Sequence, residues 1–124
     1  MIKTHISTDR LVTEIIREAE NIKAQDIVLM DLRGIENTVC DYFIICSGTS
    51  NTHVAAIASA IEKEVSKTTK EKPWHVEGAQ VAEWILLDYI HVVVHIFQEP
   101  VRKHYDIEGL WGDAGITHIS QTLV

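Results

Sequence analysis

The chain has 124 residues, of which 46% are hydrophobic and 23% are charged. This composition is typical of a globular domain and excludes a disordered chain, which combines few apolar residues with a high net charge. The formal net charge of −7 makes nucleic acid phosphates an unfavourable direct partner, because phosphate binding depends on clustered Lys and Arg. We therefore expect no direct nucleic-acid specificity, and a basic protein surface is the better expected partner.

The two cysteines, Cys40 and Cys46, are spaced for neither a zinc site nor a CxxC redox motif. Cys46 lies in an apolar run, which predicts a buried thiol rather than a catalytic nucleophile. The first residues lack the apolar segment of a signal peptide, and the apolar stretches are too short to span a bilayer. The sequence thus predicts a cytoplasmic protein without a membrane segment.

The first half of the chain predicts two amphipathic helices and two buried strands. The expected elements are a helix over 7–24, a strand over 26–32, a strand over 42–46 and a long helix that begins after Ser50. Apolar residues repeat at helical spacing in both helices: Leu11, Val12, Ile15, Ile16, Ala19 and Ile22 in the first, and Val54, Ile57, Ala58, Ile61 and Val65 in the second. Ser7 or Thr8 can cap the first helix, and Ser50 can cap the second.

The second half of the chain predicts strands followed by a last helix. The expected elements are an edge strand over 73–78, a hairpin of Trp84–Asp88 with His91–Phe97, and a helix from Pro100 that carries Val101, Tyr105, Leu110 and Trp111. The segment 112–124 has no clear period. These elements predict a single-domain α/β fold over 7–113, with a mixed sheet of about five strands flanked by helices. We expect residues 114–124 to form a loosely attached, flexible tail.

His91 and His95 are the first candidates for a metal site. Three valines separate them, which favours a strand. On a strand, residues four apart share a face but lie about 13 Å from each other. A metal ion with bonds of about 2.1 Å cannot bind both rings, so we expect no metal.

The Gly-Ser turn Ser47–Ser50 leaves a strand and opens a helix, a geometry that can hold a phosphate. It lacks the Lys of a Walker loop and the spaced glycines of a dinucleotide fingerprint. Nucleotidyltransferases have a similar turn, together with a carboxylate pair on a nearby strand that holds magnesium. The available pairs fall on or beside predicted helices, where such residues point apart: Glu62 with Glu64, and Asp106 with Glu108. We therefore predict a helix cap here, with no cofactor and no enzyme activity.

Aromatic and acidic residues are concentrated in the C-terminal half. They are Trp74, Glu77, Trp84, Asp88, Tyr89, Phe97, Glu99, Tyr105, Glu108 and Trp111. Aromatic residues anchor protein interfaces where they are exposed together, although each of these could equally belong to the core. Trp84 and Trp111 lie near the ends of their elements, where full burial is harder.

Several segments, taken in order, resemble the ribosomal silencing factor family, also called the Iojap-like proteins. The resemblance covers residues 7–113 and is carried by Asp26–Leu32, Asp41–Ser50, His53-Val54, Val76-Glu77-Gly78, Trp84–Asp88, Val92–Phe97, Arg102 and Tyr105–Trp111. It implies a nucleotidyltransferase-like fold without catalytic function. It also implies a translational repressor that binds the large ribosomal subunit through ribosomal protein L-fourteen and sterically blocks association with the small subunit.

Carried over by position, the protein-binding residues of the family correspond to Trp84, Asp88, Tyr89 and Tyr105, with Glu77 and Trp111 nearby. An assembly factor that uses the same surface on precursor large subunits is the main alternative. A divergent nucleotidyltransferase and a homodimer closed through the aromatic residues are two further alternatives.

Two positions depart from the family pattern. Thr52 stands where the family often has Arg, and Ile90-His91 stand where it often has Gly-Asp in the hairpin turn. Because a β-branched residue avoids positive φ, we expect the turn at Ile90 to differ in conformation from the Gly-Asp turn that is common in the family.

Overall fold

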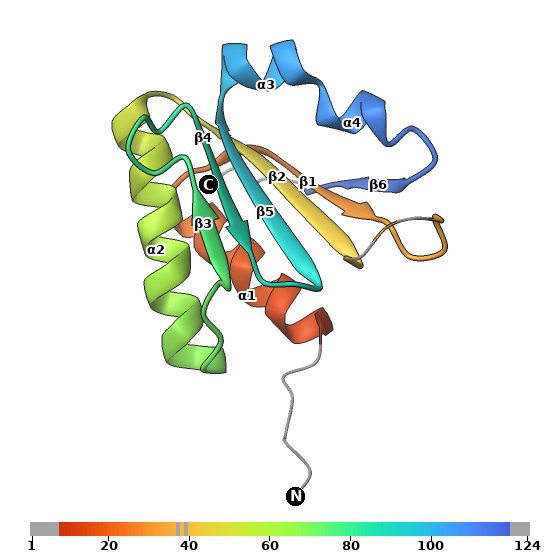
Figure 1. The fold of residues 1–124 in the computed structure, drawn as a ribbon. Coiled ribbons are helices and arrows are strands. Elements are labelled where there is room, and N and C mark those ends of the chain that lie inside the picture. Colours follow the sequence, from red (N-terminus) through yellow and green to blue (C-terminus); the bar gives the residue numbers. More distant parts are fainter. Residues whose placement is uncertain (1–7, 37, 39, 120–124) are drawn as a thin grey trace, which may run out of the picture.

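The structure is a computed structural model that describes residues 8–36, 38 and 40–119. Its helices are α1 (Thr8–Asn21), α2 (Asn51–Thr69), α3 (Glu99–Tyr105) and α4 (Ile107–Leu110). Its strands are β1 (Gln25–Asp31), β2 (Tyr42–Gly48), β3 (His75–Glu77), β4 (Trp84–Asp88), β5 (Val92–Gln98) and β6 (Gly115–His118). Figure 1 shows their arrangement in one α/β domain, which confirms the predicted fold class.

The strands form one sheet in the order β3-β4-β5-β2-β1-β6. The central strands β2 and β5 are parallel, and all other neighbouring strands are antiparallel. The sheet is therefore mixed, the β4–β5 hairpin is confirmed, and β3 lies at an edge as its proline predicted.

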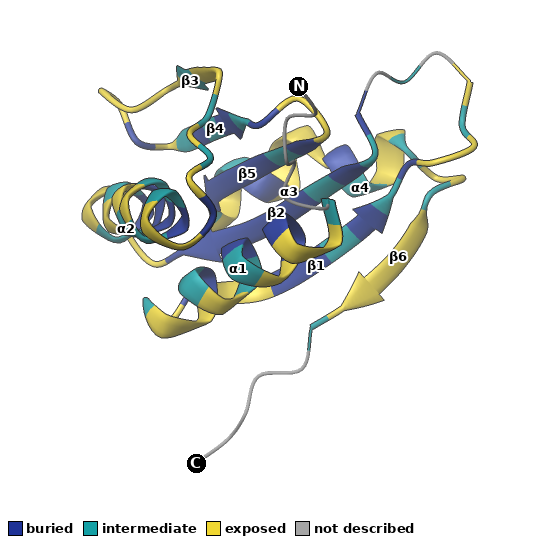
Figure 2. Cartoon of the chain, turned by 90° about the horizontal axis from the view of Figure 1, so that it is seen from below, coloured by how far each residue is buried: buried dark blue, intermediate teal, exposed yellow. Residues whose placement is uncertain are grey.

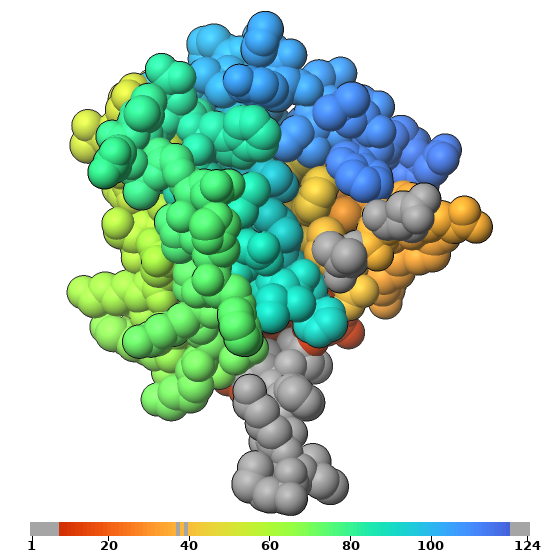
Figure 3. Space-filling view, viewed as in Figure 1, coloured from red at the N-terminus to blue at the C-terminus, as the bar shows by residue number. Residues whose placement is uncertain are grey.

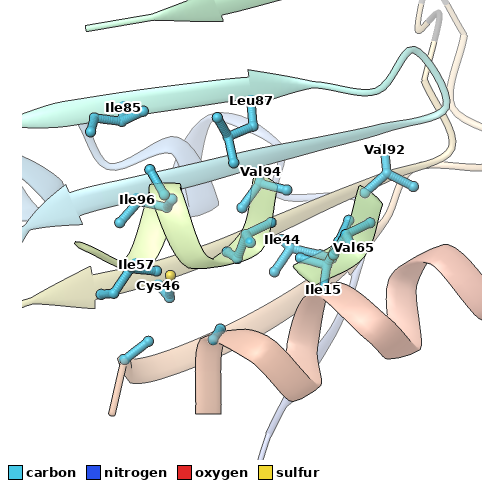
Figure 4. Packing of buried hydrophobic residues seen from close by; sticks show 14 of the residues in the cluster. Ile15, Ile44, Cys46, Ile57, Val65, Ile85, Leu87, Val92, Val94 and Ile96 are labelled. Carbon is cyan, nitrogen blue, oxygen red and sulfur yellow. The ribbon is translucent and has the colours of Figure 1, made fainter. Parts of the chain in front are cut away.

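Helices α1 and α2 lie side by side on one face of the sheet, with their buried residues turned toward it (Figure 2). All five predicted stripe residues of α2 are buried, and Ile15 and Ala19 of α1 are fully enclosed. They pack on alternate residues of the strands, such as Ile44, Ile85 and Val94 (Figure 4). This layer is the main hydrophobic core, because every one of these side chains is removed from water.

The predicted cap of α2 is confirmed. The Ser50 hydroxyl accepts a hydrogen bond from the His53 backbone N–H at 3.1 Å. Gly48, two residues before this cap, lies very close to α2, because a Cβ at position 48 would be 2.9 Å from the Val54 side chain. Glycine at position 48 thus lets α2 pack closely against the end of β2.

The opposite face of the sheet, which we call the second face, is only partly covered. Helices α3 and α4 cross one end of it and bury a smaller cluster that includes Val28, Met30, Ile45, Phe97 and Ile107. Figure 1 shows these helices above the sheet, with the lower parts of β4 and β5 uncovered. The second face is therefore where side chains of the sheet can meet a partner.

Two expectations about the C-terminal part are wrong in detail. The expected last helix is two short helices, broken at Asp106, whose φ is +44° and whose side chain accepts from the Gly109 N–H at 3.2 Å. The sheet has six strands rather than about five, because residues 115–118 pair with β1. Ser7 and residues 120–124 lie outside the described part of the chain.

The hairpin turn also differs from expectation. Ile90 has a φ of +77°, the region that we expected a β-branched residue to avoid. Its backbone N–H donates to the Asp88 carboxylate at 2.7 Å, and the Tyr89 N–H donates to the Val92 carbonyl at 2.8 Å. These bonds hold the tight turn in place against the strain at Ile90.

Candidate functional site

The predicted binding residues of β3 and β4 divide between the two faces of the sheet according to strand alternation. Trp84 and Asp88 point to the second face, and Glu77 joins them because it pairs directly with Leu86 of β4. Tyr89 points to the opposite face, where it lies in the main core with 6% of its surface exposed. We therefore leave Tyr89 out of the candidate surface.

Trp84 lies at the centre of a row of aromatic side chains on the second face. Its ring stacks on Phe97 and contacts Tyr105 of α3, each with a ring-centroid distance of 4.8 Å. Its indole N–H donates to Nδ1 of His95 at 3.1 Å. Tyr105 is 48% exposed, so the row begins in the core at Phe97 and emerges at the surface.

The aromatic row continues across β2 to α4. Phe43 contacts the His95 ring edge-on at 4.6 Å and the Trp111 ring at 5.8 Å. Trp111 is half-buried, whereas its neighbour Leu110 is 76% exposed. The structure thus brings Trp84, Tyr105 and Trp111 into one connected row of rings, and adds Phe43 and His95 to it.

A buried arginine holds α3 and α4 against the sheet. Arg102 donates to the Asp26 carbonyl and to the Ser47 hydroxyl, both at 2.8 Å, and it pairs with the Glu108 carboxylate at 3.0 Å. An Arg–carboxylate pair with two hydrogen bonds fixes orientation as well as distance. Arg102 and Glu108 therefore position the two helices that carry Tyr105 and Trp111.

A hollow opens on the second face beside the aromatic row. It has a volume of about 440 Å³, and its walls include Cys40, Phe43, Leu86, Val93 and Trp111. Asp88 and Ile90 lie at its hairpin side. In Figure 3 this face is turned toward the reader, with β5 near the centre and both helix α4 and the loop before β2 on the right.

His95 is the site residue with the most altered chemistry. It is 4% exposed, and burial lowers the pKa of its imidazole to about 4, so the ring is neutral near pH 7. Because Nδ1 accepts from Trp84, the proton of the neutral ring is on Nε2. That Nε2 is buried and has no hydrogen-bond partner among the residues that the structure describes.

The two histidines that were weighed as a metal pair have separate environments. His95 is enclosed, while His91 is exposed and lies 3.7 Å from the Asp41 carboxylate. Within the described residues, no group of three or more His, Cys, Asp or Glu side chains is placed to hold a metal ion. Residues 8–36, 38 and 40–119 also contain no helix long and apolar enough to cross a membrane.

The Gly-Ser turn is engaged in contacts within the chain. The Thr49 backbone N–H donates to Nδ1 of His53 at 2.9 Å, and Nε2 of His53 lies 2.7 Å from the Ile22 carbonyl oxygen. The hollow beside the turn is lined by Glu99, whose charge repels a phosphate. The turn therefore joins α2 to the end of α1, and these contacts disfavour a phosphate there.

The residues considered for catalysis are likewise used in structure. Asp106 caps α4, and Glu108 pairs with Arg102. Cys46 is fully buried, and burial raises its thiol pKa to about 12, which confirms that it is a core residue rather than a reactive nucleophile.

Comparison with known proteins gives a consistent result. Residues 5–123 match the family model described as "Ribosomal silencing factor during starvation". The ribosomal silencing factor RsfS of Bacillus subtilis is 39% identical over 97 residues, which cover 78% of this chain and 80% of that protein. A solved structure from Chromobacterium violaceum has a TM-score of 0.81 at 30% identity and covers 96% of this chain and 95% of its own.

Relatives from organelles are also similar over most of this chain. The mouse protein named "Mitochondrial assembly of ribosomal large subunit protein 1" is 30% identical over 90 residues, 71% of this chain and 39% of that protein. The chloroplast protein Iojap of Zea mays is 34% identical over 102 residues, 79% of this chain and 42% of that protein.

Proposed function

The chain belongs to the family of ribosomal silencing factors, and from this premise we propose that it represses translation by binding the large ribosomal subunit through its second face. In this proposal the contacted component is ribosomal protein L-fourteen, and the bound protein sterically prevents the small subunit from joining. The protein acts in the cytoplasm by occupying a surface, with no catalysed reaction.

The observation that carries the proposal is the group of anchoring side chains gathered on the second face. Trp84, Tyr105 and Trp111 belong to one row of contacting rings beside an apolar hollow, and Tyr105 is 48% exposed. Aromatic anchors next to a pocket are typical of the centre of a protein interface. This face is the part of the sheet that α1 and α2 leave free.

Charge supports a basic partner. Asp88 lies at the hollow and Glu77 is exposed on the neighbouring strand, in a chain whose net charge is −7. Arg33, on the loop before β2, is held by the Asp31 carboxylate through hydrogen bonds of 2.8 and 3.0 Å. The carboxylates of Asp88 and Glu77, the latter 3.3 Å from Nε2 of His75, are charges that this face offers to Lys or Arg of a partner.

Co-sedimentation with purified ribosomal subunits at physiological salt tests the proposal. We expect the protein to pellet with large subunits and to stay in the supernatant with small subunits. A chain lacking the Glu77 and Asp88 charges (Glu77→Gln with Asp88→Asn) should bind more weakly, with a smaller response to added salt. Equal binding to both subunits, or none to either, would contradict the proposal.

The family relatives favour a second candidate, a role in assembly of the large subunit. The mouse relative is named for assembly of the mitochondrial ribosomal large subunit, and its matching region covers 71% of this chain. An assembly factor with the same surface would bind precursor large subunits in preference to mature ones. Cells depleted of the protein would then accumulate large-subunit precursors, whereas loss of repression alone would leave subunit maturation unchanged.

A further inference from the structure

The hollow on the second face has the dimensions and lining of a binding pocket. Its volume is about 440 Å³, and its walls are mostly apolar, with Phe43, Leu86 and Val93 from the strands and Leu32, Cys40, Ile90 and Trp111 from outside them. Specific pockets are typically apolar with a few well-placed polar groups. Here the polar groups are the imidazole of His95, the carboxylate of Asp88 and the hydroxyl of Thr38, and the Thr38 hydroxyl already donates to backbone carbonyls of its own loop.

His95 contributes a buried donor that has no acceptor among residues 8–36, 38 and 40–119. Its Nδ1 is occupied by the Trp84 indole, so Nε2 carries the proton, and no described residue accepts from Nε2. A buried donor without a partner lowers stability, because it loses the hydrogen bonds that it makes to water in the unfolded chain. Such a group in a pocket wall is explained if a bound partner supplies the acceptor.

Ile90 places an apolar side chain at the edge of the pocket at the expense of backbone strain. Its φ is +77°, which a β-branched residue rarely adopts, and its side chain is 42% exposed while lining the pocket. Glycine would remove this strain. Contact of Ile90 with a partner would explain why an apolar side chain occupies the position.

The charge at the pocket selects among partners. Its lining residues within the described chain include the carboxylate of Asp88 and no lysine or arginine. With the net charge of −7, this favours a segment of a basic protein over an acidic peptide or a nucleic acid.

We propose that the pocket receives one apolar side chain from a basic protein segment, and that an oxygen acceptor of the same segment bonds to Nε2–H of His95. This inference rests on the proposed function and assigns its specificity to Val93, His95 and Ile90. Trp84 then has two roles, since it packs in the aromatic row and also fixes the tautomer of His95 that presents the donor.

Filling the pocket tests the first half of the proposal. Val93→Phe should occupy the hollow from its wall and lower the affinity for large ribosomal subunits at least tenfold. Val81→Phe is the matched control, because Val81 is 60% exposed and does not line the pocket. Thermal unfolding of each variant shows whether it is folded.

Changing the donor tests the second half. In His95→Asn the shorter amide can still accept from Trp84 but does not reach the position of Nε2–H. We expect a loss of affinity of three- to tenfold, the size of one hydrogen bond. In His95→Gln the amide N–H lies near the position of Nε2, so this variant should bind more tightly than His95→Asn.

Thiol labelling gives a test on the unmodified protein. Cys40 lines the pocket at 8% exposure, and burial raises the pKa of its thiol, so it reacts slowly in the free protein; Cys46 is fully buried and serves as the internal control. Bound large subunits should slow the alkylation of Cys40 by N-ethylmaleimide. Mass spectrometry of the peptide that contains Cys40 measures the extent of this reaction. Unchanged labelling of Cys40 in the bound state would overturn the pocket proposal.

The outcomes separate the two proposals. If the unmodified protein does not bind large subunits, the proposed function fails. If it binds and Val93→Phe binds equally well, the pocket proposal fails and the proposed function stands. If Val93→Phe changes self-association in sedimentation velocity and leaves subunit binding intact, the pocket holds a second copy of the chain and the proposal is overturned.

Discussion

The indole N–H of Trp84 donates to Nδ1 of His95 at 3.1 Å, across the pairing of β4 with β5. This bond joins the exposed part of the second face to its interior, because Trp84 also contacts Tyr105 while His95 contacts Phe43. It determines which nitrogen of His95 carries the proton. The aromatic row is therefore a connected arrangement rather than a set of independent surface residues.

Tyr105→Ala is the variant that best separates binding from stability. Tyr105 is half-exposed at the end of α3, so its removal should change the free energy of unfolding by less than about 1 kcal/mol. Loss of an aromatic anchor should weaken binding to large subunits by about 2 kcal/mol. Co-sedimentation and thermal unfolding of the same preparation check both values. Trp84→Ala is less selective, because Trp84 stacks on buried Phe97 and would also destabilise the fold.

Arg102→Ala should destabilise the protein strongly. It leaves the partly buried Glu108 carboxylate without its cation and removes hydrogen bonds to Asp26 and Ser47. Breaking such a pair costs about 3 kcal/mol or more. Urea unfolding measures the change. Lys103→Ala is the matched control, since its ion pair with Glu99 is exposed and should change stability by less than about 0.5 kcal/mol. A similar effect for the two variants would show that Arg102 does not fix the helices.

His95 should make stability fall on acidification. Burial lowers the pKa of its imidazole from 6.5 to about 4 in the folded state. Between these values the unfolded chain binds a proton that the folded chain does not, so stability is lost as the pH falls from 6.5 toward 4. The full effect is about 3 kcal/mol.

His95→Asn is the control for this pH dependence, because asparagine does not titrate. We expect the difference in unfolding free energy between the two proteins to narrow as the pH is lowered from 7 to 4. Chemical denaturation at a series of pH values measures this difference. A constant difference across the series would contradict the assignment of a neutral, buried imidazole.

Ile90→Gly should stabilise the fold and weaken binding at the same time. Glycine adopts positive φ without strain, while it costs about 0.5–1 kcal/mol of chain entropy relative to other residues. The expected net gain in unfolding free energy is therefore small, up to about 1 kcal/mol. Binding to large subunits should decrease because the pocket loses its apolar edge. A variant that is destabilised, or that binds more tightly, would show that Ile90 has another role.

Much of the fold could be predicted because burial is periodic in this chain. The helical stripes of 7–24 and 54–65 and the apolar run of 42–46 each face a dense core, so their patterns survive in the structure. Strand β6 could not be found in this way, because all four of its residues are exposed and only its backbone pairs with β1. The break at Asp106 could not be predicted from the apolar pattern, because a left-handed (αL) backbone at one residue does not change the spacing of apolar residues in the sequence.

The candidate surface was predicted in part. The concentration of aromatic and acidic residues predicted Trp84, Tyr105, Trp111, Glu77 and Asp88, whereas Tyr89 lies in the core because side chains alternate between the two faces along β4 and beyond Asp88. His95 and Phe43 were missed, because their meeting depends on the register of parallel strands β2 and β5. That register arises from long-range pairing, which a single sequence does not reveal.

The claim that the bound protein blocks subunit joining is tested most directly by a joining assay in which the order of addition is varied. Light scattering measures the formation of complete ribosomes. Large subunits incubated with the protein before small subunits are added should fail to form complete ribosomes. Tyr105→Ala and Val93→Phe should restore joining in proportion to their loss of affinity, while Val81→Phe should block joining as the unmodified protein does. Normal joining in the presence of saturating, bound protein would contradict the central claim.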